Sequence, residues 1–293
     1  MDKRIVITGA GIISSLGKNK EDFLRNFLSG HLAIKSKIED FDAVGILGQG
    51  GIRTLDRSSL LSLSASKIAI EDANLNIGQL DSSDIGVSLG TMGSIFSGFD
   101  FYRVKLLESP RYVNPMQFSN TVVNASAGQI AIRFGLNGFN ATISTGACAG
   151  MDAIIYASQM IKKSKANIVL AGGVEEYCDE INSVFKLVKG EDISEGAAIL
   201  ILEDLDFALG RKANILAEII DTCQENRLSR ENLEPEQFSI KEKLGNLYSA
   251  TGAFKTLIAS LLIKNNTRNS ISLNCSSCLG NYSSITLSKF NAE

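Results

Sequence analysis

The chain has 293 residues, 44% of them hydrophobic, which is enough to bury a large core as one big domain or as two fused halves. A net charge of −3 leaves no basic footprint for nucleic acid, and no apolar run is long enough to span a membrane. Five irregularly spaced cysteines and a strand that begins at residue 4, with no room before it for a signal peptide, predict a soluble, cytoplasmic protein.

The first elements are a strand and a helix. Residues 4–17 (RIVITGAGIISSLG) predict a buried strand followed by a glycine-rich turn. The GAG sequence resembles a dinucleotide-binding turn only weakly, because the third glycine and a later acidic residue are missing, so a plain strand-to-helix turn is the preferred interpretation. Residues 20–29 predict an amphipathic helix, and His31, the sole histidine, follows it as an expected surface cap.

The next elements alternate between helix and strand. A helix is expected over 58–74, a strand over 85–89 and a small-residue helix over 122–134. Residues 97–108 (SGFDFYRVKLLE) predict a short helix that is rich in aromatic residues. Such residues pack in a core or line a ligand channel, and the sequence leaves both alternatives open.

The centre of the chain is a strand that enters a helix through small residues. A β-branched run over 141–145 reaches Gly146 and Ala147, and the helical pattern continues to about Lys163. Glycine and alanine let a ligand approach the backbone, and the first N–H groups of a helix remain unpaired. A cysteine at such an elbow would be activated by the positive end of the helix dipole, so the role of Cys148 becomes the main question.

The last third carries fewer elements. Strands over 167–173 and 198–203 continue the alternation and predict an α/β fold. The remaining expected elements are a strand over 215–220, a helix over 247–263 and strands over 272–274 and 284–287, with a polar, aperiodic stretch at 221–239.

Cys275 and Cys278 form a CxxC pair between the last two predicted strands. Structural zinc needs four ligands, and the sequence supplies neither a second pair at suitable spacing nor a nearby histidine. A redox pair is expected at the start of a helix rather than between strands. No metal and no cofactor are therefore predicted.

Several stretches together resemble the β-ketoacyl synthase family of the thiolase fold. They are RIVITGAGIISSLG, NASAGQIAIRFGLNG, IVLAGGVEE, EGAAILILED, NILAEII and GNLYSATGAFKTLIASLL, in the order of the family. The resemblance implies two βα halves in α-β-α-β-α layers, with an N-terminal half over 1–205 and a shortened C-terminal half over 206–293 in one compact unit. It also implies dimerisation through the strand before the elbow, made here of Ala141, Thr142, Ile143, Ser144 and Thr145.

The resemblance also shows what the active site lacks. Active members use an elbow cysteine as acyl acceptor and two histidines that assist decarboxylation of the malonyl extender. Aligned without gaps, the cysteine position falls on Ala147, and Cys148 comes one residue later, a rotation of about 100° on a helix. Asn246 replaces one histidine, the motif of the other is absent, and Lys241 matches the family lysine.

This pattern resembles the chain-length-factor subunits of type II polyketide systems, and the short second half is most similar to the aryl polyene versions. The resemblance implies a catalytically silent subunit that pairs with an active ketosynthase as a heterodimer. It meets acyl carrier protein through that complex and shapes the acyl chain pocket. The helix over 97–108 would form the pocket floor, with Phe101, Val104 and Leu107 as gating candidates that limit chain length by filling volume.

Two alternatives remain. The chain could be an enzyme that uses Cys148 as acyl acceptor, or that decarboxylates malonyl groups with Lys241 and Asn246, because amides can donate to an oxyanion. A free-standing acyl-binding module is less favoured, since a lone subunit of this fold would expose an apolar dimer surface.

Overall fold

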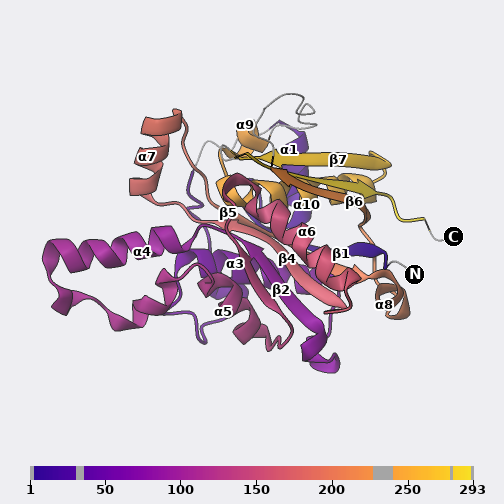
Figure 1. Cartoon of the computed structure of the whole chain (residues 1–293), viewed down its shortest axis with the longest axis horizontal. Helices are drawn as coiled ribbons and strands as arrows, with labels where there is room; N and C mark the ends of the chain where they lie inside the picture. The colour runs from indigo at the N-terminus through magenta and orange to yellow at the C-terminus, as the bar shows by residue number, and fades with distance from the viewer. Residues whose placement is uncertain (1–2, 31–35, 227–239, 278–279, 292–293) are drawn as a thin grey trace.

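The computed structural model is an α/β protein built on one eight-stranded sheet (Figure 1). It describes residues 3–30, 36–226, 240–277 and 280–291, so His31, the stretch 227–239 and Cys278 lie outside the described residues. The strand order is β3-β2-β4-β5-β1-β6-β8-β7. The strands are β1 (Ile5–Ile13), β2 (Ile85–Gly90), β3 (Asn140–Ile143), β4 (Ile168–Glu175), β5 (Gly196–Asp204), β6 (Ala217–Asn226), β7 (Ser270–Ser276) and β8 (Asn281–Ser288).

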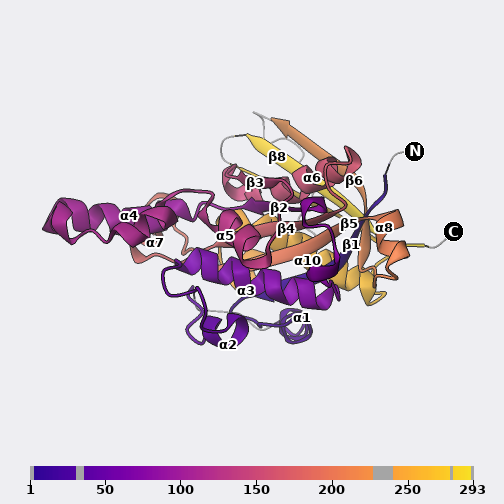
Figure 2. The same ribbon diagram turned by 90° about the horizontal axis from the view of Figure 1, so that it is seen from below.

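The helices cover the sheet in layers, which Figure 2 shows edge-on. The helices are α1 (Lys20–Leu28), α2 (Ala43–Leu47), α3 (Arg57–Asp72), α4 (Ser94–Arg103), α5 (Ala125–Phe134), α6 (Ala149–Lys162), α7 (Asp179–Lys189), α8 (Leu205–Gly210), α9 (Ile240–Leu244) and α10 (Thr251–Lys264). Helix α3 packs on β1 and β5. Helices α6 and α10 each contact strands from both ends of the sheet order, α6 through β2 and β8 and α10 through β4 and β7. From Gly252 to Ile263, α10 is buried on every side, as expected of a helix that is apolar all round. The predicted thiolase-like α/β fold is confirmed.

Strands β7 and β8 have a polar outer face. In β7 and β8 the residues Ile271, Leu273 and Ile285 point toward α10 and are buried. Between them, Ser272 pairs with Thr286, and their hydroxyl oxygens are 3.0 Å apart. This alternation is typical of a sheet with one wet face.

The glycine-rich turn predicted within residues 4–17 is wrong. Strand β1 continues through the GAG sequence to Ile13 and pairs with β5 along its length. The glycines serve close packing, because a Cβ on Gly11 would lie 1.9 Å from the carbonyl oxygen of Ala65 in α3. The GAG sequence is therefore part of a strand, and its residues are small because α3 packs closely on that strand.

Two other segments differ from the expected elements. The helix predicted over 97–108 begins earlier, as α4, and continues as one π-helical segment, Val104–Glu108. Helix α7 was not predicted, and none of its residues is buried.

Among the described residues, no helix combines the length and hydrophobicity that crossing a membrane requires.

Candidate functional site

The elbow after β3 is a tight turn into α6. Gly146 has a φ of +68°, and its ideal Cβ would lie 3.2 Å from the hydroxyl oxygen of Tyr248, so only glycine fits there without strain. A single 3-10 turn, Gly146–Cys148, leads into α6. The Thr145 hydroxyl donates to Asp152 over 2.5 Å and ties the start of the elbow to the helix.

A cavity of about 290 Å³ opens at the elbow, and Ala147 lies in its wall. The structure brings Ala147 together with Lys241 and Asn246, the other two positions that the sequence analysis singled out at the degenerate active site. The described lining is completed by Glu191, Ile240, Gly245, Thr251, Lys255, Asn274, Cys275 and Ser276. At the elbow, the cavity thus faces the methyl group of Ala147.

Cys148 lies outside this cavity lining. Its side chain is fully buried beneath α6, and its sulfur lies 3.5 Å from the carbonyl oxygen of Asn281, to which it donates. Burial, followed by the nearby Cys275 and Asp152, raises the pKa of the Cys148 thiol to about 12. A thiol with that pKa carries almost no thiolate at neutral pH.

The polar side chains of the cavity are held by a carboxylate that the sequence analysis missed. Glu191 accepts from Lys241 Nζ over 2.5 Å through one oxygen and from Asn246 Nδ2 over 2.9 Å through the other. The Lys241 ammonium is the main reason that the pKa of Glu191 lies below its ordinary value. No motif marked Glu191, because only the fold brings the loop after α7 to the elbow.

Lys255 is a second cation in the cavity wall. It lies on the buried helix α10, is 5% exposed, and donates to the carbonyl oxygen of Asn274 over 2.9 Å. A charged side chain is costly to bury without polar partners. The position of Lys255 at the cavity wall therefore makes its ammonium one of the charged groups of the site. The sequence signal was a lone lysine in the run TGAFKTLIASLLI.

Glu175 is a buried carboxyl beside the site. It accepts from the backbone N–H of Ser249 over 3.2 Å and from the Ser249 hydroxyl. Burial raises the pKa of Glu175 to about 8, so the group is mostly neutral at pH 7. It does not line the cavity, and its hydrogen bonds hold the turn Tyr248–Ala250 under the elbow.

Of the three gating candidates, Phe101 lies at a second cavity, of about 440 Å³. Phe101 lines it, together with residues 53–57, 114–120 in part, and 176–180. The Phe101 ring packs against Phe118 with centroids 5.9 Å apart. Leu107 is 77% exposed and does not line this cavity, and the side chain of Val104 lies outside the described residues.

The predicted interface strand is β3, at one edge of the sheet. It pairs in parallel with β2, and β2 is its sole partner among the described strands. Ser144 is exposed, and Ala141, Thr142, Ile143 and Thr145 are partly exposed.

Within the described ranges, no group of histidine, cysteine, aspartate and glutamate side chains could hold a metal ion.

Comparisons with known proteins agree with this geometry. Residues 37–187 match the family model described as the N-terminal domain of β-ketoacyl synthase. The 3-oxoacyl-[acyl-carrier-protein] synthase 2 of Coxiella burnetii is 25% identical over 90% of this chain and 87% of its own length. The protein of the same name from Synechocystis is 28% identical, but only 62% of its length is covered.

Solved structures show the same fold. The ishigamide ketosynthase/chain length factor aligns with 99% of this chain and 100% of its own, at a TM-score of 0.88 and 18% identity. A type II polyketide acyl-carrier protein in complex with its ketosynthase aligns with 98% and 100%, at a TM-score of 0.85 and 21% identity. Since the family model matches more than half of the sequence, the chain belongs to the β-ketoacyl synthase family.

Proposed function

We propose that this chain is a non-condensing, chain-length-factor-like subunit that pairs with an active β-ketoacyl-ACP synthase and shapes its acyl chain pocket. The observation that carries the proposal is the elbow, where Ala147 faces the cavity and Cys148 is turned into the core. Acyl transfer needs a thiolate, and decarboxylation needs donors aimed at the developing enolate. The elbow position that faces the cavity is Ala147, which has no thiol, and both candidate donors bind Glu191.

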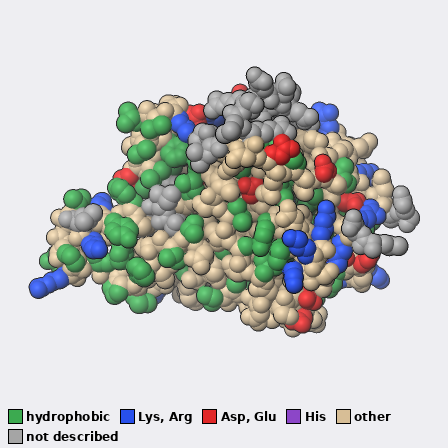
Figure 3. All heavy atoms as spheres, viewed as in Figure 1, with side chains coloured by type: hydrophobic (Ala, Val, Ile, Leu, Met, Phe, Trp, Pro, Cys, Tyr) green, Lys and Arg blue, Asp and Glu red, His purple; other side chains and the backbone are tan. Residues whose placement is uncertain are grey.

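An apolar arm supports the pairing. The arm, residues 94–123, extends from the body of the protein, and Figure 3 shows hydrophobic side chains gathered over it and over α7. Its exposed large hydrophobic residues are Phe99, Tyr102, Leu107, Tyr112, Met116, Phe118, Val122 and Val123. Apolar surface of this extent is typical of a face that another protein covers.

The edge strand β3 gives the partner a second point of attachment. The edge of a sheet presents unpaired N–H and C=O groups, and β3 has only four residues, which limits uncontrolled strand addition. A matching strand from an active ketosynthase would continue the sheet across a heterodimer. Acyl carrier protein would then meet the complex at the active partner.

The product class is proposed from the sequence resemblance. The aryl polyene systems are the polyketide systems that the sequence resembles most, which supports a product of that class. The ishigamide structure, whose description names a ketosynthase and a chain length factor, supports a role in polyketide or fatty-acid-like chain building. The subunit would belong to an acyltransferase complex without activity of its own.

Phe101→Ala should lengthen the products of the complex by about one or two two-carbon units, because a close-packed wall limits chain growth by its volume. Phe101 lines the larger cavity, so removing its ring extends the available space. Mass spectrometry of products from the reconstituted complex gives the chain length. Leu28→Ala is the control, since Leu28 is 58% exposed on α1, is not part of the arm and does not line that cavity. Unchanged products from an intact Phe101→Ala complex would rule out Phe101 as a gate.

A further inference from the structure

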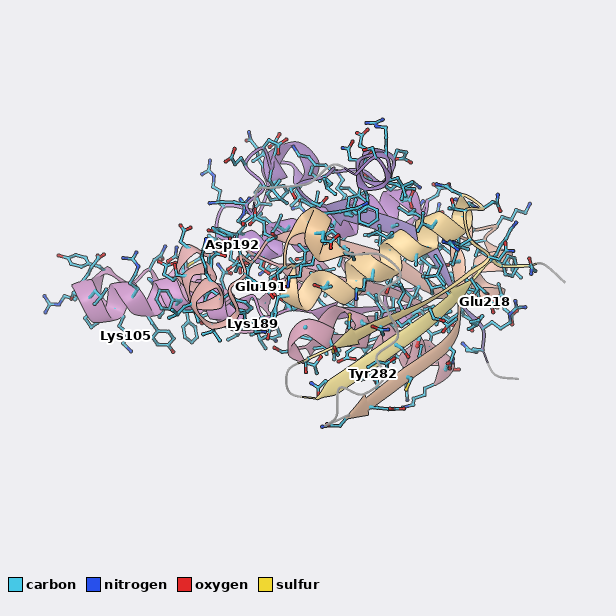
Figure 4. All side chains as sticks on the ribbon, turned by 90° about the horizontal axis from the view of Figure 1, so that it is seen from above. Lys105, Lys189, Glu191, Asp192, Glu218 and Tyr282 are labelled. Atoms are coloured by element: carbon cyan, nitrogen blue, oxygen red, sulfur yellow. The ribbon has the colours of Figure 1, made fainter. Side chains whose placement is uncertain are left out.

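Glu191 lines the elbow cavity and occupies part of it with a carboxylate. Its two carboxylate oxygens bind the Lys241 ammonium and the Asn246 amide. These are the side chains that occupy positions of the family lysine and a catalytic histidine. Figure 4 shows Glu191 beside Lys189 and Asp192 at the end of α7, next to the elements that carry the cavity.

The backbone around Glu191 is fixed in place. Helix α7 ends at Gly190, which has a φ of +70°. Ile193 forms a parallel bridge with Asn246, and the Ser194 N–H donates to the Asn246 carbonyl oxygen over 2.8 Å. Gly245 permits this contact, since a Cβ there would lie 2.1 Å from the Ser194 hydroxyl oxygen.

The neighbouring carboxylate has a different environment. Asp192 accepts from Asn182 over 2.9 Å and from Lys186 over 3.3 Å, and it does not line the cavity. The two adjacent acidic residues therefore have different partners: Glu191 lines the cavity, and Asp192 binds side chains of α7.

The charge of the cavity depends on Glu191. Among the described lining residues the charged groups are the Lys241 and Lys255 ammoniums and this one carboxylate. Without Glu191, two cations and the Asn246 amide would face the cavity of about 290 Å³. Charge-assisted hydrogen bonds from such groups are the usual means of holding a carboxylate.

We propose that Glu191 is a resident carboxylate, which occupies the anion position of the elbow cavity and excludes acidic acyl groups from this subunit. This inference rests on the proposed function, because it explains how a silent subunit avoids competing with its active partner for acidic substrates. Glu191 would thus determine specificity, because its own carboxylate fills the position that an acidic acyl group would need.

The test is a titration with malonate at constant ionic strength, observed at the Ala147 methyl group. Only this chain carries ¹³C-labelled alanine, so the signal reports the elbow whether the chain is alone or in a complex, and Ala147→Gly assigns it. The wild-type signal should not move. Glu191→Ala should give a saturable shift, with an apparent affinity at least about tenfold higher than that of the wild type.

Further variants keep the result interpretable. Glu191→Gln should also bind malonate, because it removes the carboxylate charge that pairs with the Lys241 ammonium, and it serves if Glu191→Ala does not fold. Asp192→Ala should behave as the wild type, and Glu191→Ala combined with Lys241→Ala should lose the gain. Neutral malonamide should cause no comparable shift.

Two results would overturn the inference: equal malonate affinity in the wild type and both Glu191 variants, or no shift in folded Glu191 variants. Either result would leave the proposed function standing, because pairing with a ketosynthase is measured separately by the mass of the complex. Conversely, a chain that fails to pair could still show malonate binding on removal of Glu191.

Discussion

Ala147→Cys should introduce a thiol that is alkylated at least about a thousandfold faster than Cys148. The new side chain would face the cavity at the start of α6, where Ala147 is partly exposed. The Cys148 thiol is buried, and its pKa is raised to about 12. Against an ordinary cysteine pKa of about 8.5, this difference alone changes the thiolate fraction at neutral pH by roughly three orders of magnitude.

The measurement is iodoacetamide labelling of the native protein, followed by peptide mass mapping over time. Cys148→Ser removes the native elbow thiol, and Ala147→Cys in that background isolates the new one. Cys223, which is only partly buried, is an internal reference for an accessible thiol. Fast, saturable labelling of Cys148 in the wild type would contradict the silent elbow and favour the enzyme alternative.

Leu107→Glu should weaken the complex with the ketosynthase by roughly 30- to 1000-fold, the loss expected when a central apolar contact is replaced by a charge. Leu107 is on the arm and is 77% exposed, so the substitution should change the stability of the isolated chain by less than about 0.5 kcal/mol. Sedimentation or light scattering of the mixed subunits across a concentration series gives the dissociation constant.

The matched control is Leu28→Glu on α1, where the leucine is 58% exposed and lies away from the arm (Figure 2). It adds the same charge to a different surface and should leave pairing unchanged. If both variants pair as the wild type does, Leu107 is not in the interface, and the arm loses its main support as the docking surface.

Local patterns in the sequence were sufficient for the framework of the fold. Strands β2, β4 and β5 are continuous apolar runs, and the small residues around Gly146 predicted the turn between β3 and α6. The turn predicted at Gly9 and Gly11 was wrong, because local composition does not distinguish a glycine that bends the chain from one that admits a neighbouring helix.

The chemistry of the cavity depended on contacts between distant segments. Glu191 reaches Lys241 and Asn246 across 50 and 55 residues, and nothing near Glu191 in the sequence indicates that contact. Lys255 and Asn274 likewise meet only because α10 packs against β7. Helix α7 was also missed, although its apolar residues recur at helical spacing; Val184, Leu187 and Val188 are exposed.

The most direct test of the proposed function is native mass spectrometry of the wild-type chain, alone and co-expressed with the ketosynthase encoded beside it. The expected result is a one-to-one complex, with the chain aggregated or insoluble on its own because its apolar arm is uncovered. A stable homodimer that does not bind the ketosynthase would contradict the partner-subunit role, and the chain would then have to be studied as an enzyme in its own right.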